Sequence, residues 1–335
     1  MKKTLIALAA LAAVGTVSAQ TVVLGGVARY AYQRSAADTS VKDNTGFAVP
    51  DLIARLTVSE DVGVAKLTGV FGLDLGDAGR NAAVTRNDYT ITAAGNFGSV
   101  DGYSKEAANQ AENALSGLVS LPNGLDSTAS SYKSLASHSN VKGLGYTSTE
   151  IVPGLKARVA YSTYDQLTDS TNPALVNPAA RGFYTGKNLT VSYAAGPFKA
   201  ALGYTQYNNK NTDAAATKNT HKVDLFGTYD LGVAKLGLGY VKTSSKTGAD
   251  VKPTIIASAY APFGAYEFGV DYAQKSALGT TPKVSYTALG AHYNLSKATF
   301  LEASVGGFKG QTAANIAGGA PSNVKQYRVG ITKNF

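Results

Sequence analysis

The last nine residues, Tyr327-Arg328-Val329-Gly330-Ile331-Thr332-Lys333-Asn334-Phe335, alternate between apolar and polar side chains and end on an aromatic residue. Successive side chains of a β-strand point to opposite faces, so the tyrosine, valine, isoleucine and phenylalanine share one apolar face. An apolar outer face, a polar inner face and a terminal aromatic residue are typical of the closing strand of a transmembrane β-barrel. A half-buried strand of a soluble β-sandwich alternates in the same way, so the rest of the chain decides between the two folds.

The N-terminus has the pattern of a secretory signal peptide. Lys2 and Lys3 precede an apolar segment from residue 5 to residue 14, and Val17-Ser18-Ala19 has the pattern of a cleavage site. We therefore expect residues 1–19 to be removed and residues 20–335 to form one barrel domain. No later apolar run approaches the roughly 20 residues that a membrane-spanning helix needs.

The composition limits the classes of function. The chain has 31 basic and 22 acidic residues, and loss of Lys2 and Lys3 leaves 29 basic residues, an excess that fits an anionic solute or an acidic surface. Nucleic acid is a poor partner for an exported chain without a basic cluster. The absence of cysteine excludes disulfides and thiolate metal sites. The 20 tyrosines, 36 glycines and near-zero mean hydropathy fit a barrel whose apolar residues alternate with polar ones.

One unit recurs along the chain: an alternating segment, a tight turn, a second alternating segment and a longer polar loop. In residues 65–73, for example, Leu67, Gly69, Phe71 and Leu73 form the apolar face. Alternation of period two sustained over such segments predicts β-strands throughout.

The connections between these segments are of two kinds. The short turns are expected at residues 59–63, 96–98, 153–154, 196–197, 230–232, 262–264 and 294–297. The long loops are expected near residues 34–46, 76–88, 106–138, 166–183, 209–218, 245–252, 276–283 and 310–324. Seven short and eight long connections join sixteen strands, and an even number of strands closes an antiparallel sheet without edges. We therefore predict an all-β fold, a 16-stranded antiparallel transmembrane β-barrel with short periplasmic turns and long extracellular loops. A pair of β-sandwiches is the alternative, but no linker divides the chain.

Several of these turns also carry short motifs that occur in the same order in a known family. The motifs are Ser59-Glu60-Asp61-Val62-Gly63, Gly95-Asn96-Phe97-Gly98-Ser99-Val100, Ser192-Tyr193-Ala194-Ala195-Gly196-Pro197-Phe198, Tyr229-Asp230-Leu231-Gly232-Val233-Ala234-Lys235-Leu236, Pro262-Phe263-Gly264, Tyr293-Asn294-Leu295-Ser296-Lys297 and the terminal Phe335. With these motifs the mature chain resembles the general porins of β-proteobacterial outer membranes. The resemblance implies a trimeric barrel whose third long loop folds into the pore, and a last strand, ending at Phe335, that serves as the signal for outer-membrane assembly.

The residues needed for catalysis or metal binding do not occur in a recognisable pattern. The three histidines, His138 in a loop and His221 and His292 on expected strands, are far apart and lack metal-ligand spacing. Gly186-Lys187 is followed by Asn188, so it does not complete a phosphate-binding loop. We therefore expect no enzyme activity, no cofactor and no metal.

Charged side chains should line the inner face of the barrel. Alternation places these basic residues there: Arg29, Arg55, Lys66, Lys156, Arg158, Lys199, Lys222, Lys235 and Arg328. The acidic residues on the same face are Asp74, Asp224, Glu267, Asp271 and Glu302. Rings of charge select ions in pores, so the basic excess predicts a preference for anions, with Arg29, Arg55, Lys66, Lys156 and Arg158 as the candidate pore-lining residues. The alternative is that these charges keep the wall hydrated without affecting selectivity.

The loop from residue 106 to residue 138 is the longest before the midpoint, and loops of this length usually have a function or are disordered. By resemblance it takes the place of the inward-folded constriction loop, with Glu106, Glu112 and Asp126 as its candidate acids.

Together these features predict an integral protein of the Gram-negative outer membrane. The expected function is that of a general diffusion porin that passes ions and small hydrophilic, preferably anionic, solutes. The expected partners are two further copies of the chain, outer-membrane lipid and lipopolysaccharide. A non-conducting barrel that acts as a surface anchor or adhesin is the alternative, because sequence does not show whether water fills the bore.

Overall fold

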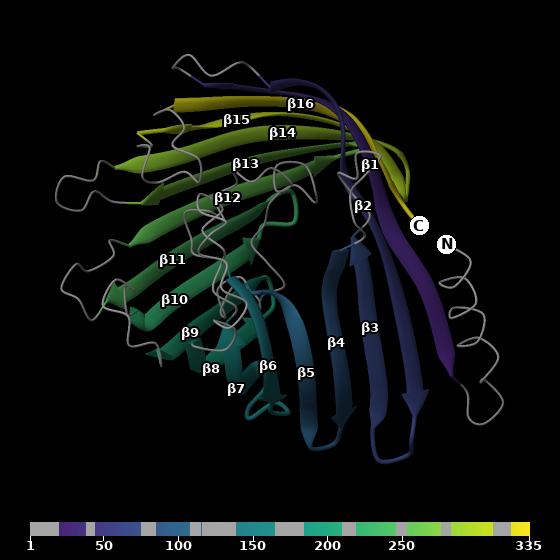
Figure 1. Cartoon of the computed structure of the whole chain (residues 1–335), viewed down its shortest axis with the longest axis vertical. Helices are drawn as coiled ribbons and strands as arrows, with labels where there is room; N and C mark the ends of the chain where they lie inside the picture. The colour runs from purple at the N-terminus through teal and green to yellow at the C-terminus, as the bar shows by residue number, and fades with distance from the viewer. Residues whose placement is uncertain are drawn as a thin grey trace.

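The computed structural model describes residues 20–37, 44–74, 85–107, 115, 139–164, 184–209, 219–245, 253–275, 283–310 and 323–335. These residues form sixteen antiparallel strands in one closed barrel (Figure 1). The first eight are β1 (Thr21–Ala37), β2 (Asn44–Asp61), β3 (Lys66–Asp74), β4 (Thr85–Gly95), β5 (Gly98–Ala107), β6 (Ser139–Thr147), β7 (Leu155–Tyr164) and β8 (Tyr184–Ala195). The other eight are β9 (Phe198–Asn209), β10 (Asn219–Asp230), β11 (Lys235–Ser245), β12 (Thr254–Phe263), β13 (Tyr266–Lys275), β14 (Val284–Ser296), β15 (Thr299–Lys309) and β16 (Asn323–Asn334).

The barrel closes where the first strand meets the last. Each strand pairs with its neighbour in sequence, and β1 pairs with both β2 and β16. The terminal Phe335 extends this seam, because its carbonyl accepts a hydrogen bond from Gly26 N at 2.7 Å and its amide donates to Gly26 O at 3.1 Å. A Cβ atom at Gly26 would lie 2.7 Å from the Phe335 ring, so the glycine makes room for the aromatic side chain.

Two of the short turns use the same side-chain contact. The carboxylate of Asp61 accepts a hydrogen bond from Gly63 N, and that of Asp230 accepts one from Gly232 N, both at 2.8 Å. Both glycines have positive φ angles, 84° and 81°, which residues with a side chain rarely adopt. The Asp-x-Gly sequences therefore fix these turns at the ends of β2 and β10.

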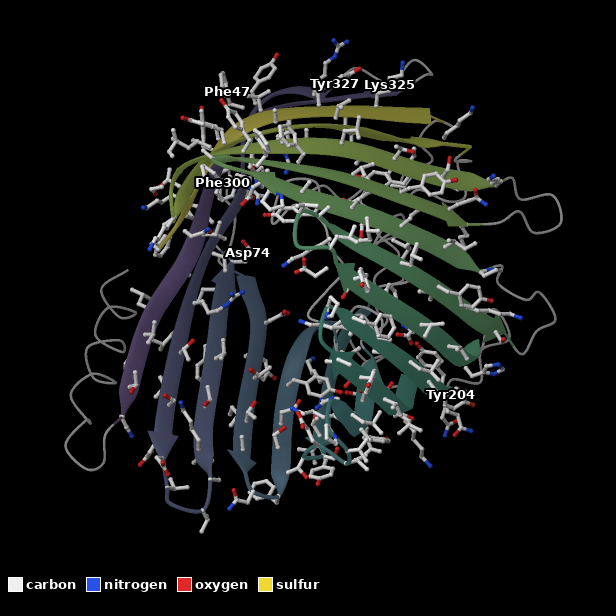
Figure 2. The ribbon with its side chains drawn as sticks, turned by 180° about the vertical axis from the view of Figure 1, so that it is seen from behind. Phe47, Asp74, Tyr204, Phe300, Lys325 and Tyr327 are labelled. Atoms are coloured by element: carbon white, nitrogen blue, oxygen red, sulfur yellow. The ribbon has the colours of Figure 1, made fainter. Side chains whose placement is uncertain are left out.

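The outer surface of the barrel is apolar. In β16, Val329 and Ile331 are 62 % and 41 % exposed, whereas Arg328 and Thr332 on either side of them are 4 % and 0 % exposed. Figure 2 shows Phe47, Tyr204 and Tyr327 projecting away from the sheet. Outward aromatic residues lie near both rims, as in outer-membrane barrels, where they mark the two membrane interfaces. Those near the long loops are Tyr30, Tyr32, Phe47, Tyr161, Tyr204, Tyr240, Tyr272 and Tyr327, and those near the short turns are Tyr146, Tyr193, Phe198, Tyr229, Phe263, Tyr266, Tyr293 and Phe335.

The inner wall carries one apolar region along β9 to β15. Its buried members are Ala201, Phe226, Val241, Ile256, Ala273, Val284, Tyr286, Ala288 and Phe308. Leu115, from the segment between β5 and β6, packs against this cluster. The third long loop therefore reaches the inner wall at this residue, as predicted for an inward-folded loop.

The sixteen strands and the two classes of connection confirm the predicted fold, with corrections to several boundaries. β4 begins at Thr85, inside the predicted loop 76–88. β1 extends to Ala37 and β2 begins at Asn44, so much of the predicted loop 34–46 is strand. Glu106 lies in β5, paired with Asn140, and not in the loop. Backbone pairing does not need apolar side chains, so these strands continue past the point where the alternation ends. The predicted leader, residues 1–19, lies outside the described residues, and within them no helix is long and apolar enough to cross a membrane.

Candidate functional site

The candidate site is the charged inner face of the barrel. Residues paired across adjacent strands share a face of the sheet. Leu56 pairs with the outward-facing Leu24, so its neighbour Arg55, which pairs with Gly25, faces inward. The same reasoning places every charged residue predicted for the inner face on that face. The structure separates the basic residues among them into buried, paired residues and residues exposed within the barrel.

Arg29 belongs to a buried polar network at the seam between β15, β16 and β1. Its Nε donates a hydrogen bond to Thr332 Oγ1 at 3.1 Å and lies 3.4 Å from Glu302 Oε2. The Thr332 hydroxyl donates to the same carboxylate oxygen at 3.1 Å, and Arg328 Nη1 lies 4.0 Å from Glu302 Oε1. One carboxylate thus serves two arginines, and the network joins strands at opposite ends of the sequence.

Arg158 is held flat against the wall of β5 and β6. Its guanidinium forms a two-pronged ion pair with Asp101, with the second contact, Nη2 to Oδ2, at 2.8 Å. It also donates to Thr147 Oγ1 at 3.0 Å and lies 5.6 Å from the centre of the Tyr103 ring. A Cβ atom at Gly145 would lie 2.1 Å from Nη2, so this glycine provides the space that the guanidinium occupies. The charge of Arg158 is therefore largely balanced by Asp101.

Besides Lys235, four basic residues are exposed within the barrel: Arg55, Lys66, Lys156 and Lys199. Each lysine is the first or second residue of its strand, β3, β7 or β9, so the three lie at the short-turn rim. Lys235, the first residue of β11, lies at the same rim, but its Nζ is 3.4 Å from Asp230 Oδ2. Within the described part of the chain, the ion pairs identified here do not involve these four residues. Lys66 is directly opposite Asp61 in the sheet and Lys199 interacts electrostatically with Asp230, so Arg55 and Lys156 are the least compensated of the four.

Asp101 is the main functional residue that the sequence prediction missed. The alternation of β5 places it on the inner face with Tyr103, so a search of every strand for charges would have found its orientation. Its pairing with Arg158 depends on the register across β5, β6 and β7, where both residues lie beside the β6 segment Gly145–Thr147. Asp61 and Asp230 also share the inner face, so the basic excess is smaller than the sequence count indicates.

The predicted loop acids are placed only in part. Glu106 is located on β5, but its side chain is not described, and Glu112 and Asp126 lie outside the described residues. Leu115 is the described point of contact between this loop and the wall.

The two described histidines lie on opposite faces of the barrel wall. His292 of β14 is buried on the inner face, with Nδ1 3.6 Å from Glu267 Oε2 and its ring 4.4 Å from that of Phe300. His221 of β10 lies on the outer face beside Tyr204, and His138 lies outside the described residues. Among the described residues, no three His, Cys, Asp or Glu side chains gather in a way that could hold a metal ion.

Comparison with known proteins agrees with this architecture. Residues 4–313 match the family described as Gram-negative porin. The chain is 26 % identical over 364 residues to outer membrane porin protein 32 of Delftia acidovorans, with all of both chains covered.

Solved porin structures share the fold at low sequence identity. The trimer form of OmpT from Vibrio cholerae has a TM-score of 0.64 at 14 % identity and covers 95 % of this chain and 100 % of its own. A triple mutant of the Rhodopseudomonas blastica porin has a TM-score of 0.58 at 15 % identity and covers 94 % and 100 %.

Proposed function

Because the chain belongs to the Gram-negative porin family and is an integral protein of the outer membrane, we propose that it is a general diffusion pore with a preference for anions. The observation that carries the proposal is a closed barrel of sixteen strands with an apolar outer face and a charged inner face. A barrel of this size is wide enough for an aqueous channel. Solutes would cross by passive diffusion, without catalysis, cofactor or metal.

The anion preference rests on charges that are exposed and that are not held in the buried ion pairs. Arg29 and Arg158 were both predicted to line the pore. Arg158 is balanced by its ion pair with Asp101, and Arg29 is buried in a network in which it shares Glu302 with Arg328. Arg55, Lys66, Lys156 and Lys199 are exposed, and we assign the preference to them. A positively charged rim concentrates anions at the periplasmic mouth before they reach the narrower part of the bore.

The third loop would set the size limit for solutes. The support is Leu115, which packs on the inner-wall cluster of β9 to β15, opposite the wall formed by β2 and β3. Small hydrophilic solutes would then pass between the loop and the side of the wall that carries Arg55 and Lys66.

We further propose that the protein works as a homotrimer and contacts outer-membrane lipid and lipopolysaccharide. The support for the trimer is the likeness of the fold to OmpT of Vibrio cholerae, which was solved in a trimer form. The support for the lipid contact is the apolar outer face between two rows of aromatic residues.

The test is conductance and reversal potential of the purified protein in a planar bilayer under a KCl gradient. Wild type should insert in triple steps and favour chloride, and a variant with Lys156→Glu and Lys199→Glu should shift toward potassium. Lys333→Glu, on the outer face at the same rim, is the matched control and should leave the permeability ratio unchanged. A preparation that never conducts would leave the anchor or adhesin function instead.

A further inference from the structure

The ladder of hydrogen bonds between the first and the last strand stops before β1 does. Its last pair is Gly26 with Phe335, whose amides and carbonyls bond to each other, and residues 27–37 pair with β16 as well. β1 begins at Thr21, and residues 21–25 pair with β2 on one side only. Figure 1 shows β1 continuing past the C-terminus toward the short turns. We call residues 21–25 the open edge.

Two residues of the open edge direct their backbone hydrogen-bonding groups away from β2. In an antiparallel ladder, every second residue directs its N–H and C=O groups to the same side. Because Gly26 bonds to Phe335, Leu24 and Val22 direct theirs to that same side, where no described residue bonds to them. Val22, Val23 and Leu24 are also 53 %, 53 % and 59 % exposed. The open edge thus presents two donors and two acceptors without a described strand opposite them.

The position of the open edge favours a partner from the periplasm. Phe335 belongs to the outward aromatic residues of the short-turn rim, and residues 21–25 lie on the periplasmic side of it. A second copy in the same membrane has its β1 pointing the same way, so two open edges could not pair antiparallel. Parallel pairing would join the apolar outer face of one barrel to the polar inner face of the other. A free segment of another polypeptide meets neither obstacle.

We propose that the open edge binds an extended segment of a periplasmic polypeptide by β-strand addition. The segment would continue the ladder beyond Phe335 and run antiparallel to β1, as β16 does. Val22 and Leu24 face outward and pair with Val58 and Leu56 of β2, so apolar side chains of the segment fit opposite them. The main-chain bonds would supply affinity, and the alternation of side chains would supply specificity.

The inward side chain of the added segment would lie opposite Val23. Val23 pairs with Thr57, and the exposed Arg55 lies two residues from Thr57 on the same inner face. This separation is comparable to the Debye length of about 10 Å at 0.1 M salt, so attraction between charges still acts over it. An acidic residue is therefore favoured at this position of the segment. The inference concerns the seam of the barrel and does not depend on whether the barrel conducts.

The test measures backbone amide hydrogen exchange by NMR on the isotope-labelled, folded full-length protein in detergent micelles. The probe is a five-residue peptide of valine, glutamate, valine, threonine and valine, acetylated and amidated at its ends and added at millimolar concentration. Without the peptide, the amides of Val22 and Leu24 should exchange faster than that of Val23, which faces β2. With the peptide, exchange at Val22 and Leu24 should slow, and exchange at Val23 should stay the same.

Matched peptides and variants separate main-chain pairing from other adhesion. A peptide N-methylated on its first and third residues, whose amides face β1, should not bind, whereas one methylated on its second and fourth residues should bind. Leu24→Pro removes a donor of the open edge without removing a bond to β2, so it should weaken binding about fivefold, as expected for one backbone hydrogen bond. Leu24→Thr keeps this donor and should bind like wild type. Lysine in place of the glutamate of the probe should weaken binding, and less so at high salt.

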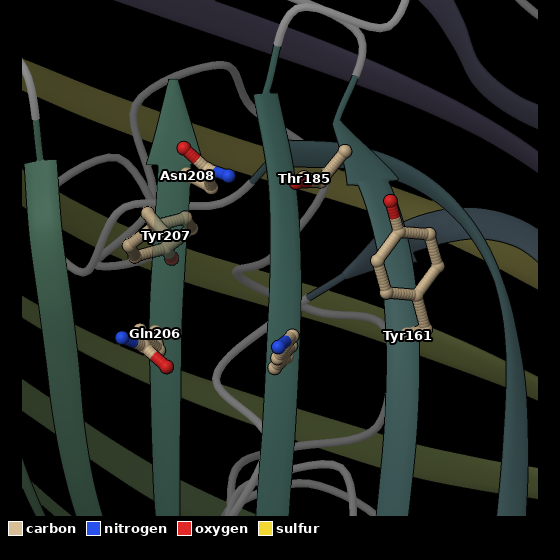
Figure 3. A pocket seen from close by; sticks show the side chains of 6 residues that line it. Tyr161, Thr185, Gln206, Tyr207 and Asn208 are labelled. Carbon is tan, nitrogen blue, oxygen red and sulfur yellow. The ribbon is translucent and has the colours of Figure 1, made fainter. Parts of the chain in front are cut away.

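A peptide could also lodge in the cavity of about 370 Å³ on β7, β8 and β9 (Figure 3). Gln206→Ala trims the lining of this cavity, so loss of binding in this variant with full binding in Leu24→Pro would overturn the assignment. Equal binding of the two methylated peptides, or unchanged exchange at Val22 and Leu24, would overturn it as well. Disulfide-linked dimers of Val22→Cys without peptide would assign the open edge to a second copy instead. Single-channel conductance should be the same in Leu24→Pro and wild type, so a failure of the pore proposal and a failure of this one are separate results.

Discussion

The ion pair between Arg158 and Asp101 gives a test in which two substitutions act in opposite directions. If Asp101 balances Arg158, then Asp101→Asn leaves an uncompensated positive charge on the wall and should increase the preference for chloride. Arg158→Gln leaves an uncompensated carboxylate and should decrease it. The double variant removes both charges and should return close to wild type, because the intact pair contributes little net charge.

The magnitude follows from the geometry of the pair. A unit charge about 6 Å from a passing ion, at an effective dielectric constant near 20, contributes roughly 3 kcal/mol. With a Debye length of about 10 Å at 0.1 M salt, screening reduces this value to roughly 1.5 kcal/mol, or about a tenfold change in local ion occupancy. The opposite charges of Arg158 and Asp101 are in direct contact and lie along the wall, so their contributions largely cancel in wild type.

The assay is the reversal potential in planar bilayers under a KCl gradient. We expect the chloride-to-potassium permeability ratio to change several-fold in each single variant, and to lose most of that change near 1 M salt, where the Debye length is about 3 Å. Heat-modifiable migration on mild gels shows that each variant is folded. Two single variants with the wild-type ratio would show that the pair is remote from the ion path, and shifts of the same sign would refute the charge balance.

Three other predictions concern closure and the loop. Gly26→Ala places a Cβ 2.2 Å from Ile53 O and 2.7 Å from the Phe335 ring, so it should lower the free energy of unfolding in urea by about 1–3 kcal/mol. Gly102→Ala is the control, because open space surrounds Gly102, and it should not destabilise the barrel. Deletion of Phe335 removes both hydrogen bonds to Gly26, and the protein should be exported but should accumulate unfolded in the periplasm, which fractionation and heat-modifiable migration measure. Leu115→Asp places a charge against the apolar inner-wall cluster and should release the loop, giving noisier single-channel currents than Leu115→Met.

The fold could be predicted from the sequence because the patterns that define a β-barrel are local. Each strand is defined by its own alternation, and each short turn by nearby residues such as Asp61 and Gly63, whose contact spans two positions. The inward orientation of Arg55 and Arg328 follows from the same alternation within their strands. Nothing beyond neighbouring residues was needed to predict sixteen strands, their order and their two faces.

The electrostatics of the site depend on contacts between strands, which the alternation of side chains within one strand does not predict. Whether Arg158 is balanced depends on the register of three strands, and Asp101 is 57 positions away from it in the sequence. The basic count therefore overstated the positive wall, because it treated paired and exposed cations alike.

The seam between β1 and β16 also has a consequence for the order of events during biogenesis. Arg29 and Thr332, which bond across it, are 303 positions apart, so the ring cannot be completed before synthesis of the chain has ended. Pairing between segments so distant in sequence is slow, and the chain must cross the periplasm with its first and last strands unpaired. An unpaired strand edge can pair with another chain. Truncation at either end would therefore leave an open sheet in place of a closed barrel, and its free edges could pair with other chains.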